Sequence, residues 1–150
     1  MKPVLRAIQS EVVSFFQKQP DLKATAKIVA NDNFLLNKRT QRRLVQAAPY
    51  VLFVDLPFPL KTLPELVAPC WDTLALKCTL LQSITTADKS NFVDYAEQVS
   101  FALAGATLTV KNLWTGKFRL AENAPWEWLT VDRKNALQVN FEATNFEVAL

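Results

Sequence analysis

Residues 50–56 read YVLFVDL, a nearly continuous apolar run rich in β-branched and aromatic side chains. A strand with one face in solvent alternates apolar and polar side chains, whereas a strand covered on both faces is apolar throughout. Pro49 stands directly before the run and ends the preceding segment, because proline cannot continue a helix. The sequence therefore predicts a central strand over residues 50–56 with both faces buried.

Proline dominates the segment that follows this strand. Five of the chain's eight prolines fall between positions 49 and 69, namely Pro49, Pro57, Pro59, Pro64 and Pro69. Because proline has no backbone N–H and a fixed φ angle, we expect residues 57–70 to form an extended, rather stiff loop. This loop is unusually apolar for a linker, since it carries Phe58, Leu60, Leu63, Leu66 and Val67. Such a loop either folds back over the core or reaches a partner protein.

A second strand is indicated by the alternation in residues 72–81, DTLALKCTLL. One face would hold Leu74, Leu76, Cys78 and Leu80, and the other face Thr73, Lys77 and Thr79. Successive side chains of a strand point to opposite faces of the sheet. We therefore expect a strand with one face in the core and the other in solvent.

Two helices are predicted by apolar side chains that recur at helical spacing. The first spans residues 3–18, with a stripe of Val4, Leu5, Ile8, Val12, Phe15 and Phe16. The second begins near Asp88 or Ser90, either of which can cap it, and its stripe is Phe92, Tyr95, Ala96, Val99, Ala102 and Leu103. Gly105 follows where a left-handed C-terminal cap is expected.

The remaining segments complete a mixed order of helices and strands. Further strands are predicted over residues 24–30, 106–114 and 118–120. Residues 136–143 and 145–150 form one strand or two, with a bulge or turn at Asn145, and residues 38–48 fit either a short helix or an extended arm. This order lacks the regular strand–helix–strand alternation of parallel sheets. We therefore expect an α+β fold, a two-layer sandwich in which two amphipathic helices pack on one face of a mainly antiparallel sheet. Residues 1–150 form one domain, because this length is typical of a single core.

The composition excludes most common enzyme designs. The chain has 150 residues with no histidine and two glycines, Gly105 and Gly116. Without histidine there is no Ser–His or Cys–His pair and no imidazole base, and two distant glycines cannot build a phosphate-binding loop. Asp94 and Glu97 share one face of the second helix, which predicts a solvated face rather than an acid–base pair. We expect no enzyme, no catalytic residue and no cofactor.

The cysteines and the apolar runs indicate the class of protein. Cys70 and Cys78 lie eight residues apart, which resembles neither a disulfide framework nor a metal site, so we expect both to be reduced. Arg6 and Gln9 interrupt the N-terminal apolar residues, unlike those of a signal peptide. No run approaches the ~18 apolar residues of a membrane span. The expectation is a soluble protein of a reducing compartment, not secreted and without membrane contact.

Positive charge is concentrated in the first part of the chain. Residues 1–60 carry a net charge of +5 and residues 61–150 one of −2, which either reflects ordinary fluctuation or favours head-to-tail pairing of copies. The densest cluster is Lys38, Arg39, Arg42 and Arg43, with no acidic residue between Asp32 and Asp55. This cluster is a solvated face, a contact to carboxylates of a protein partner, or a grip on the backbone of a nucleic acid.

Two tryptophans, Trp126 and Trp128, are separated by one residue. On a strand they would share one face. Tryptophan is favoured in desolvated protein contacts, so the pair is a candidate interface. The alternative is that both rings cap the open end of the sheet.

The order of elements resembles that of the tail terminator and minor tail (head–tail joining) proteins of tailed bacteriophages. The resemblance rests on an N-terminal helix (4–16), two strands around a long loop (51–56 and 73–81), a second helix (92–103) and C-terminal strands (139–150). It covers most of the chain and involves no diagnostic motif.

The resemblance implies a structural virion protein that is assembled in the host cytoplasm. Such a protein is expected to form a hexameric ring at the end of the tail tube and to join the tube to the head connector. In that hypothesis Lys38, Arg39, Arg42 and Arg43 contact acidic neighbours or line a lumen through which DNA passes, with non-specific DNA contact. Phe58, Leu60, Leu63 and Leu66 would reach a neighbouring subunit, and Trp126 and Trp128 are further interface candidates. The alternative function is a nucleic-acid-binding module that uses residues 38–43.

Overall fold

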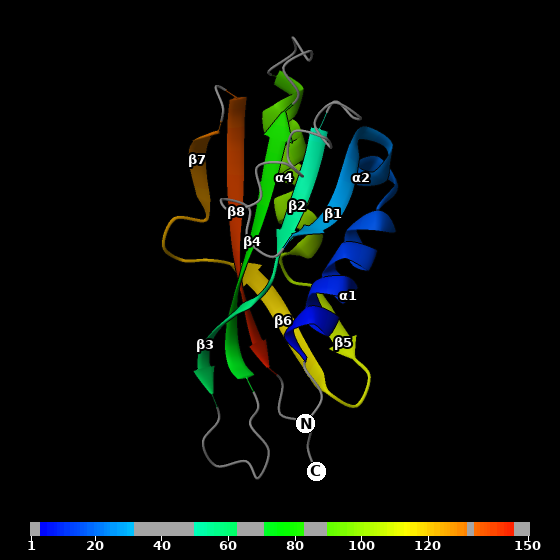
Figure 1. The fold of residues 1–150 in the computed structure, drawn as a ribbon, viewed down its shortest axis with the longest axis vertical. Helices are drawn as coiled ribbons and strands as arrows, with labels where there is room; N and C mark the ends of the chain where they lie inside the picture. Colours follow the sequence, from blue (N-terminus) through cyan, green and yellow to red (C-terminus); the bar gives the residue numbers. More distant parts are fainter. Residues whose placement is uncertain (1–3, 32–49, 63–70, 83–89, 132–133, 146–150) are drawn as a thin grey trace.

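The computed structural model describes residues 4–31, 50–62, 71–82, 90–131 and 134–145 (Figure 1). The helices in these residues are α1 (Leu5–Gln17), α2 (Pro20–Thr25) and α4 (Ser90–Leu103). The strands are β1 (Ala26–Asn31), β2 (Tyr50–Asp55), β3 (Phe58–Thr62), β4 (Trp71–Gln82), β5 (Thr107–Val110), β6 (Trp114–Leu120), β7 (Trp126–Val131) and β8 (Lys134–Asn145). The fold is therefore mixed, with more strand than helix.

The strands form one eight-stranded sheet around the long pair β4 and β8. Its order is β1-β2-β4-β8-β6-β5, with β3 paired to β4 and β7 paired to β8. All pairs are antiparallel except β1 with β2, so the prediction of a mainly antiparallel sheet is confirmed. Each central strand changes its outer partner midway: β4 passes from β3 at Ala75 to β2 at Cys78, and β8 from β7 at Val139 to β6 at Phe141. The twist of the sheet makes β4 and β8 cross in Figure 1.

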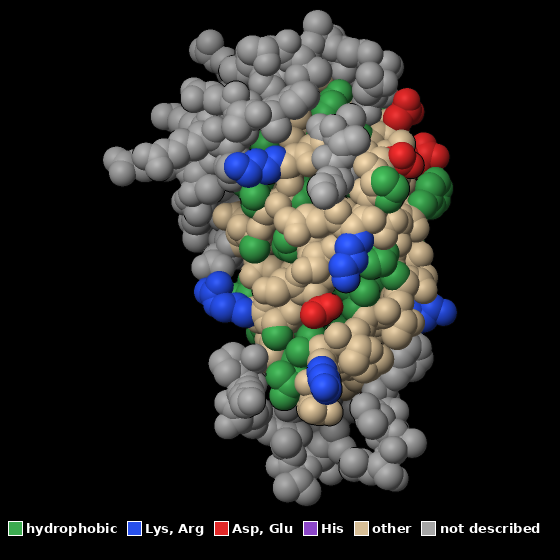
Figure 2. All heavy atoms as spheres, turned by 90° about the vertical axis from the view of Figure 1, so that its right-hand side faces the viewer, with side chains coloured by type: hydrophobic (Ala, Val, Ile, Leu, Met, Phe, Trp, Pro, Cys, Tyr) green, Lys and Arg blue, Asp and Glu red, His purple; other side chains and the backbone are tan. Residues whose placement is uncertain are grey.

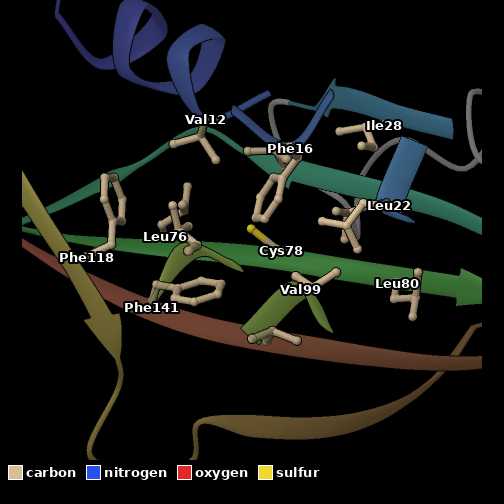
Figure 3. Close-up of a cluster of buried hydrophobic side chains, with 14 of the residues drawn as sticks. Val12, Phe16, Leu22, Ile28, Leu76, Cys78, Leu80, Val99, Phe118 and Phe141 are labelled. Carbon is tan, nitrogen blue, oxygen red and sulfur yellow. The ribbon is translucent and has the colours of Figure 1, made fainter. Parts of the chain in front are cut away.

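All three helices contribute to one core. Buried residues of α1, α2 and α4 join a single cluster with alternate residues of the strands, and ten of these side chains are labelled in Figure 3. Helix α1 contacts both β1 and β5, which stand at opposite ends of the strand order. The sheet is therefore curled, because only a curled sheet brings both of its ends to one helix.

Strand β2 is buried on both faces, as its apolar run predicts. Leu52 and Val54 belong to the large cluster with the helices. Val51 and Phe53 are fully buried in a second cluster, which includes Leu81 of β4 and Ala136 of β8. Because neighbouring side chains of a strand point to opposite faces, the second cluster lies on the sheet face away from the helices.

This second cluster changes the environment of β4. Thr79 was expected in solvent, but it is fully buried and accepts a hydrogen bond of 3.3 Å from Nε2 of Gln138 on β8. The prediction is wrong for Thr79, because the face that it shares with Leu81 is covered at this end of the sheet. It is confirmed for Lys77, which is exposed.

Both predicted helices are confirmed, and a third was missed. Pro20 begins α2, since proline suits the first turn of a helix, where no N–H partner is needed. Gly105 has φ of +86° directly after α4, and its N–H donates a hydrogen bond of 2.7 Å to the carbonyl of Phe118. The expected left-handed cap is therefore present and also anchors the end of α4 to β6.

Three strand predictions need correction. The strand expected over residues 106–114 ends at Val110, where β5 gives way to a turn at Asn112 (φ +64°), and β6 then begins at Trp114 and includes the strand expected over residues 118–120. Residues 58–62 form β3 rather than a loop, since Pro59 is tolerated in an edge strand. The predicted C-terminal strand begins two residues earlier than expected, because β8 runs from Lys134 to Asn145. Residues 63–70, with Leu63, Leu66 and Cys70, and residues 146–150 lie outside the described part.

Candidate interaction surface

Large apolar side chains are exposed at three places on the described surface. Six such residues stand out: Phe58, Leu60, Val93, Phe101, Leu113 and Trp128. Two lie on β3, three lie on α4 and β7, and Leu113 lies in the turn between β5 and β6. Isolated exposed apolar residues are ordinary, whereas groups that include aromatic rings mark contact sites.

The first tryptophan of β7 attaches this strand to α4. Trp126 donates a hydrogen bond of 2.8 Å from Nε1 to Oγ of Ser100, and this hydroxyl donates in turn to the carbonyl of Ala96, also at 2.8 Å. Both partners lie on α4, so the indole of Trp126 bridges the strand and the helix. This contact fixes the position of β7 along the axis of α4.

The second tryptophan is largely exposed on the same side of β7. Trp128 is two residues after Trp126 and so shares its face, and its side chain is 59% exposed. Its ring centroid lies 5.8 Å from that of Phe92, with the ring planes inclined by 41°. Phe92 is buried, so Trp128 covers one end of the core and still presents much of its ring to solvent.

Helix α4 adds two exposed apolar residues beside this strand. Val93 and Phe101 are 38% and 69% exposed, and with Glu97 midway between them they form a row along the helix. We call Val93, Phe101 and Trp128, the exposed apolar residues of these two elements, the α4–β7 patch; Trp128 lies at the Phe92 end of α4, and Phe101 lies about 13 Å further along the helix axis. Sequence reasoning identified Trp128 but missed the other two, because an apolar residue outside the buried stripe of a helix has no periodic signal.

Negative charge accompanies the α4–β7 patch on α4. Asp94 and Glu97 are exposed on this helix, and neither α4 nor β7 contains lysine or arginine. Glu127 is also exposed, but it lies on the face of β7 opposite to Trp126 and Trp128. Asp94, Glu97, Gln98 and Phe101 line a shallow hollow on the helix surface. Figure 2 shows acidic and hydrophobic side chains side by side at its upper right edge. The exposure of both α4 carboxylates agrees with the predicted solvated face.

Strand β3 presents a second apolar surface. Phe58 and Leu60 are 67% and 52% exposed, and the pairing of β3 with β4 becomes irregular after Pro59. Proline and irregular pairing at the edge of a sheet disfavour the addition of another strand there. A partner at this edge would therefore meet side chains rather than a regular backbone ladder.

The predicted basic cluster, Lys38, Arg39, Arg42 and Arg43, lies outside the described residues. Among described elements, the β5–β6 hairpin (107–120) is the basic counterpart of α4. It contains Lys111, Lys117 and Arg119 and no acidic residue. Arg119 forms an ion pair with Glu142 of β8 at 3.1 Å.

The reactive side chains of the core serve packing. Cys78 is a free thiol in the centre of the cluster in Figure 3, and burial together with the nearby Asp55 raises its pKa well above the usual value. Tyr95 donates a hydrogen bond of 3.1 Å to the carbonyl of Leu22, and burial raises its pKa. A neutral, inaccessible thiol is a poor nucleophile and metal ligand.

The described residues contain no group of three His, Cys, Asp or Glu side chains placed to hold a metal ion. In the same part of the chain, every helix is too short or too polar to cross a membrane.

Comparisons with known proteins add no relative. No protein-family model matches the chain, and no curated protein matches it.

Proposed function

We propose that this chain is a structural virion protein that assembles with copies of itself, as a ring, at the end of a phage tail tube. In this role it terminates the tail and joins it to the head connector. The α4–β7 patch is the observation that carries the proposal. It combines a half-exposed tryptophan with an exposed phenylalanine, the residue types that dominate protein contacts.

The distribution of charge supports contacts between unlike surfaces. The acidic side chains Asp94 and Glu97 accompany the patch on α4, whereas the β5–β6 hairpin is basic. A contact between two different surfaces of identical chains is heterologous, and such contacts build rings when the rotation closes. Contacts of this type suit a hexameric ring of the kind that the resemblance implies.

The second apolar surface gives a ring subunit another place of contact. Phe58 and Leu60 lie on β3, on the same side of Figure 1 as β7. A ring at the end of a tail tube needs contacts to its own neighbours and to the tube or connector. We assign β3 to one of these contacts, together with Leu63 and Leu66, which follow it in sequence.

In this role the fold is a two-layer sandwich, in which the helices cover one face of the curled sheet. This arrangement is supported by the core, because buried residues of α1, α2 and α4 share one cluster with alternate strand residues. In such a sandwich the strand edges and the outer face of α4 are presented on a rigid platform.

The test is the assembly state of the purified protein, measured by native mass spectrometry and particle imaging from about 1 to 100 μM. We expect a closed ring with one defined number of copies, and attachment of that ring to the ends of tail tubes. A monomer at all concentrations that never joins tubes would overturn the proposal. If it also bound nucleic acid with an affinity that fell steeply with salt, the function would be nucleic-acid binding through residues 38–43.

A further inference from the structure

We propose that the acidic hollow of α4 receives the β5–β6 turn of a second copy of this chain. The inference rests on the proposed self-assembly and names the two surfaces that meet. The hollow is lined by Asp94, Glu97, Gln98 and Phe101. The turn offers Lys111 and Leu113, both exposed.

The two surfaces match in composition and have opposite charge. Phe101 supplies an apolar surface between carboxylates, and Leu113, which is 41% exposed, supplies an apolar side chain close to Lys111. The hairpin has three basic residues and no acidic one, and α4 has two acidic residues and no basic one. Opposite potentials orient an encounter and suppress other arrangements, while the apolar contact supplies affinity.

The turn has a fixed shape before any contact. The N–H of Leu113 donates a hydrogen bond of 2.9 Å to the carbonyl of Val110, which closes the turn. Asn112 occupies the left-handed region with φ of +64°, a conformation that asparagine tolerates better than most residues. A preformed turn loses little conformational freedom when it binds.

The two surfaces occupy different parts of the chain. Helix α4 lies in the upper half of Figure 1, and the turn after β5 lies at the lower right. Contact between the turn of one copy and α4 of the next therefore leaves a free turn and a free hollow at the two ends of the pair. This is the head-to-tail arrangement that continues into a ring or a filament.

Charge reversal provides the test. Glu97→Lys and Lys111→Glu are each expected to weaken self-association roughly tenfold, since each places like charges in the contact. The combined variant Glu97→Lys/Lys111→Glu exchanges the charges and is expected to recover most of the lost association. Glu122→Lys and Lys27→Glu reverse charges at exposed positions outside the contact, and they should associate like the unchanged protein.

Sedimentation velocity and native mass spectrometry measure the association, and circular dichroism checks that each variant is folded. Recovery in the double variant supports the inference when Glu122→Lys and Lys27→Glu associate normally, because these controls change the net charge by the same amounts and so exclude a general effect of net charge. If the unchanged protein forms a ring and Glu97→Lys forms the same ring equally well, the assigned contact is wrong and the proposed function stands. If the unchanged protein never associates, the proposed function fails as well.

Discussion

The indole of Trp126 on β7 donates a hydrogen bond of 2.8 Å to the hydroxyl oxygen of Ser100 on α4. Ser100 is 2% exposed, and its hydroxyl donates a hydrogen bond to the carbonyl of Ala96. These two consecutive hydrogen bonds attach strand β7 to helix α4. The position of Trp128, and with it the α4–β7 patch, depends on this attachment.

A double-mutant cycle measures the attachment. Ser100→Ala removes the hydroxyl oxygen that accepts the hydrogen bond from the Trp126 N–H. We expect this loss to lower the free energy of unfolding by about 1–3 kcal/mol. Trp126→Phe removes the donor and should cost about 1 kcal/mol or more, because part of the ring packing is also lost. Urea unfolding of both single variants and the double variant gives the coupling, expected near 1 kcal/mol. A coupling of zero would mean that the bond contributes nothing to stability.

Gln9 makes a comparable attachment between α1 and the sheet. Its Nε2 donates hydrogen bonds of 3.0 and 2.9 Å to the carbonyls of Asn31 and Val54, at the ends of the parallel strands β1 and β2. Gln9→Met keeps the length of the side chain and removes both donors, so we expect a loss of about 1–3 kcal/mol. Gln17→Met, at an exposed position of the same helix, is the matched control and should change stability by less than about 0.5 kcal/mol. Equal effects at the two positions would contradict the assigned role of Gln9.

The two glycines are predicted to differ in how they tolerate a methyl group. At Gly116 an added Cβ would overlap the indole ring of Trp114, so Gly116→Ala should cost about 1–3 kcal/mol through overpacking. At Gly105 the space is open but φ is +86°, so Gly105→Ala should cost about 1 kcal/mol through backbone strain.

A second change distinguishes the two causes. Trp114→Phe shrinks the ring and should restore part of the stability of Gly116→Ala, measured by thermal unfolding. The same change should not restore any stability to Gly105→Ala. Failure of Trp114→Phe to improve Gly116→Ala would show that the ring is not the obstacle.

Patterns within one element predicted most of the fold correctly. Strand β2 and helices α1 and α4 have runs or stripes long enough to set their type and buried face. The C-terminal cap at Gly105 followed from the need for a positive φ after a helix. These features depend on local periodicity and backbone geometry, which a single sequence contains.

The errors came from tertiary context. Burial of Thr79 depends on a second cluster built from β2, β4 and β8, which the alternation within β4 does not indicate. The division between β5 and β6 was missed because Leu108, Val110 and Trp114 stand at alternating positions, although Asn112 interrupts this pattern at the turn. Strand β3 was missed because Pro59 argues against a central strand but not against an edge.

The candidate site was predictable only in part. The spacing of Trp126 and Trp128 indicated a shared face, but their different environments come from the position of α4. Val93 and Phe101 become candidates only because their exposure can be measured in the folded chain. A surface formed by two elements far apart in sequence has no signal in either element alone.

Because the thiol of Cys78 is buried, the free energy of unfolding is expected to fall as pH rises through the alkaline range. Burial and the charge of Asp55 raise its pKa in the folded chain, whereas in the unfolded chain it ionises near pH 8.5. Above that pH the unfolded state binds fewer protons than the folded state, so stability falls by up to about 1.4 kcal/mol per pH unit. Urea unfolding from pH 7 to 10 should show this loss in the unchanged protein. The slope should be smaller in Cys78→Ala, and parallel curves would refute the linkage.

Trp128 is predicted to matter more for assembly than for stability. Its side chain is 59% exposed, so Trp128→Ala removes only part of the packing against Phe92 and should lower the melting temperature by only a few degrees. If the α4–β7 patch is a contact surface, the same change should weaken self-association roughly tenfold or more, since tryptophans at the centre of contacts carry about 2 kcal/mol or more. Phe101→Ala, at 69% exposure, should give the same combination independently. Light scattering coupled to size-exclusion chromatography measures association and differential scanning fluorimetry measures stability. Unchanged association in both variants would remove the patch as the basis of the proposed ring.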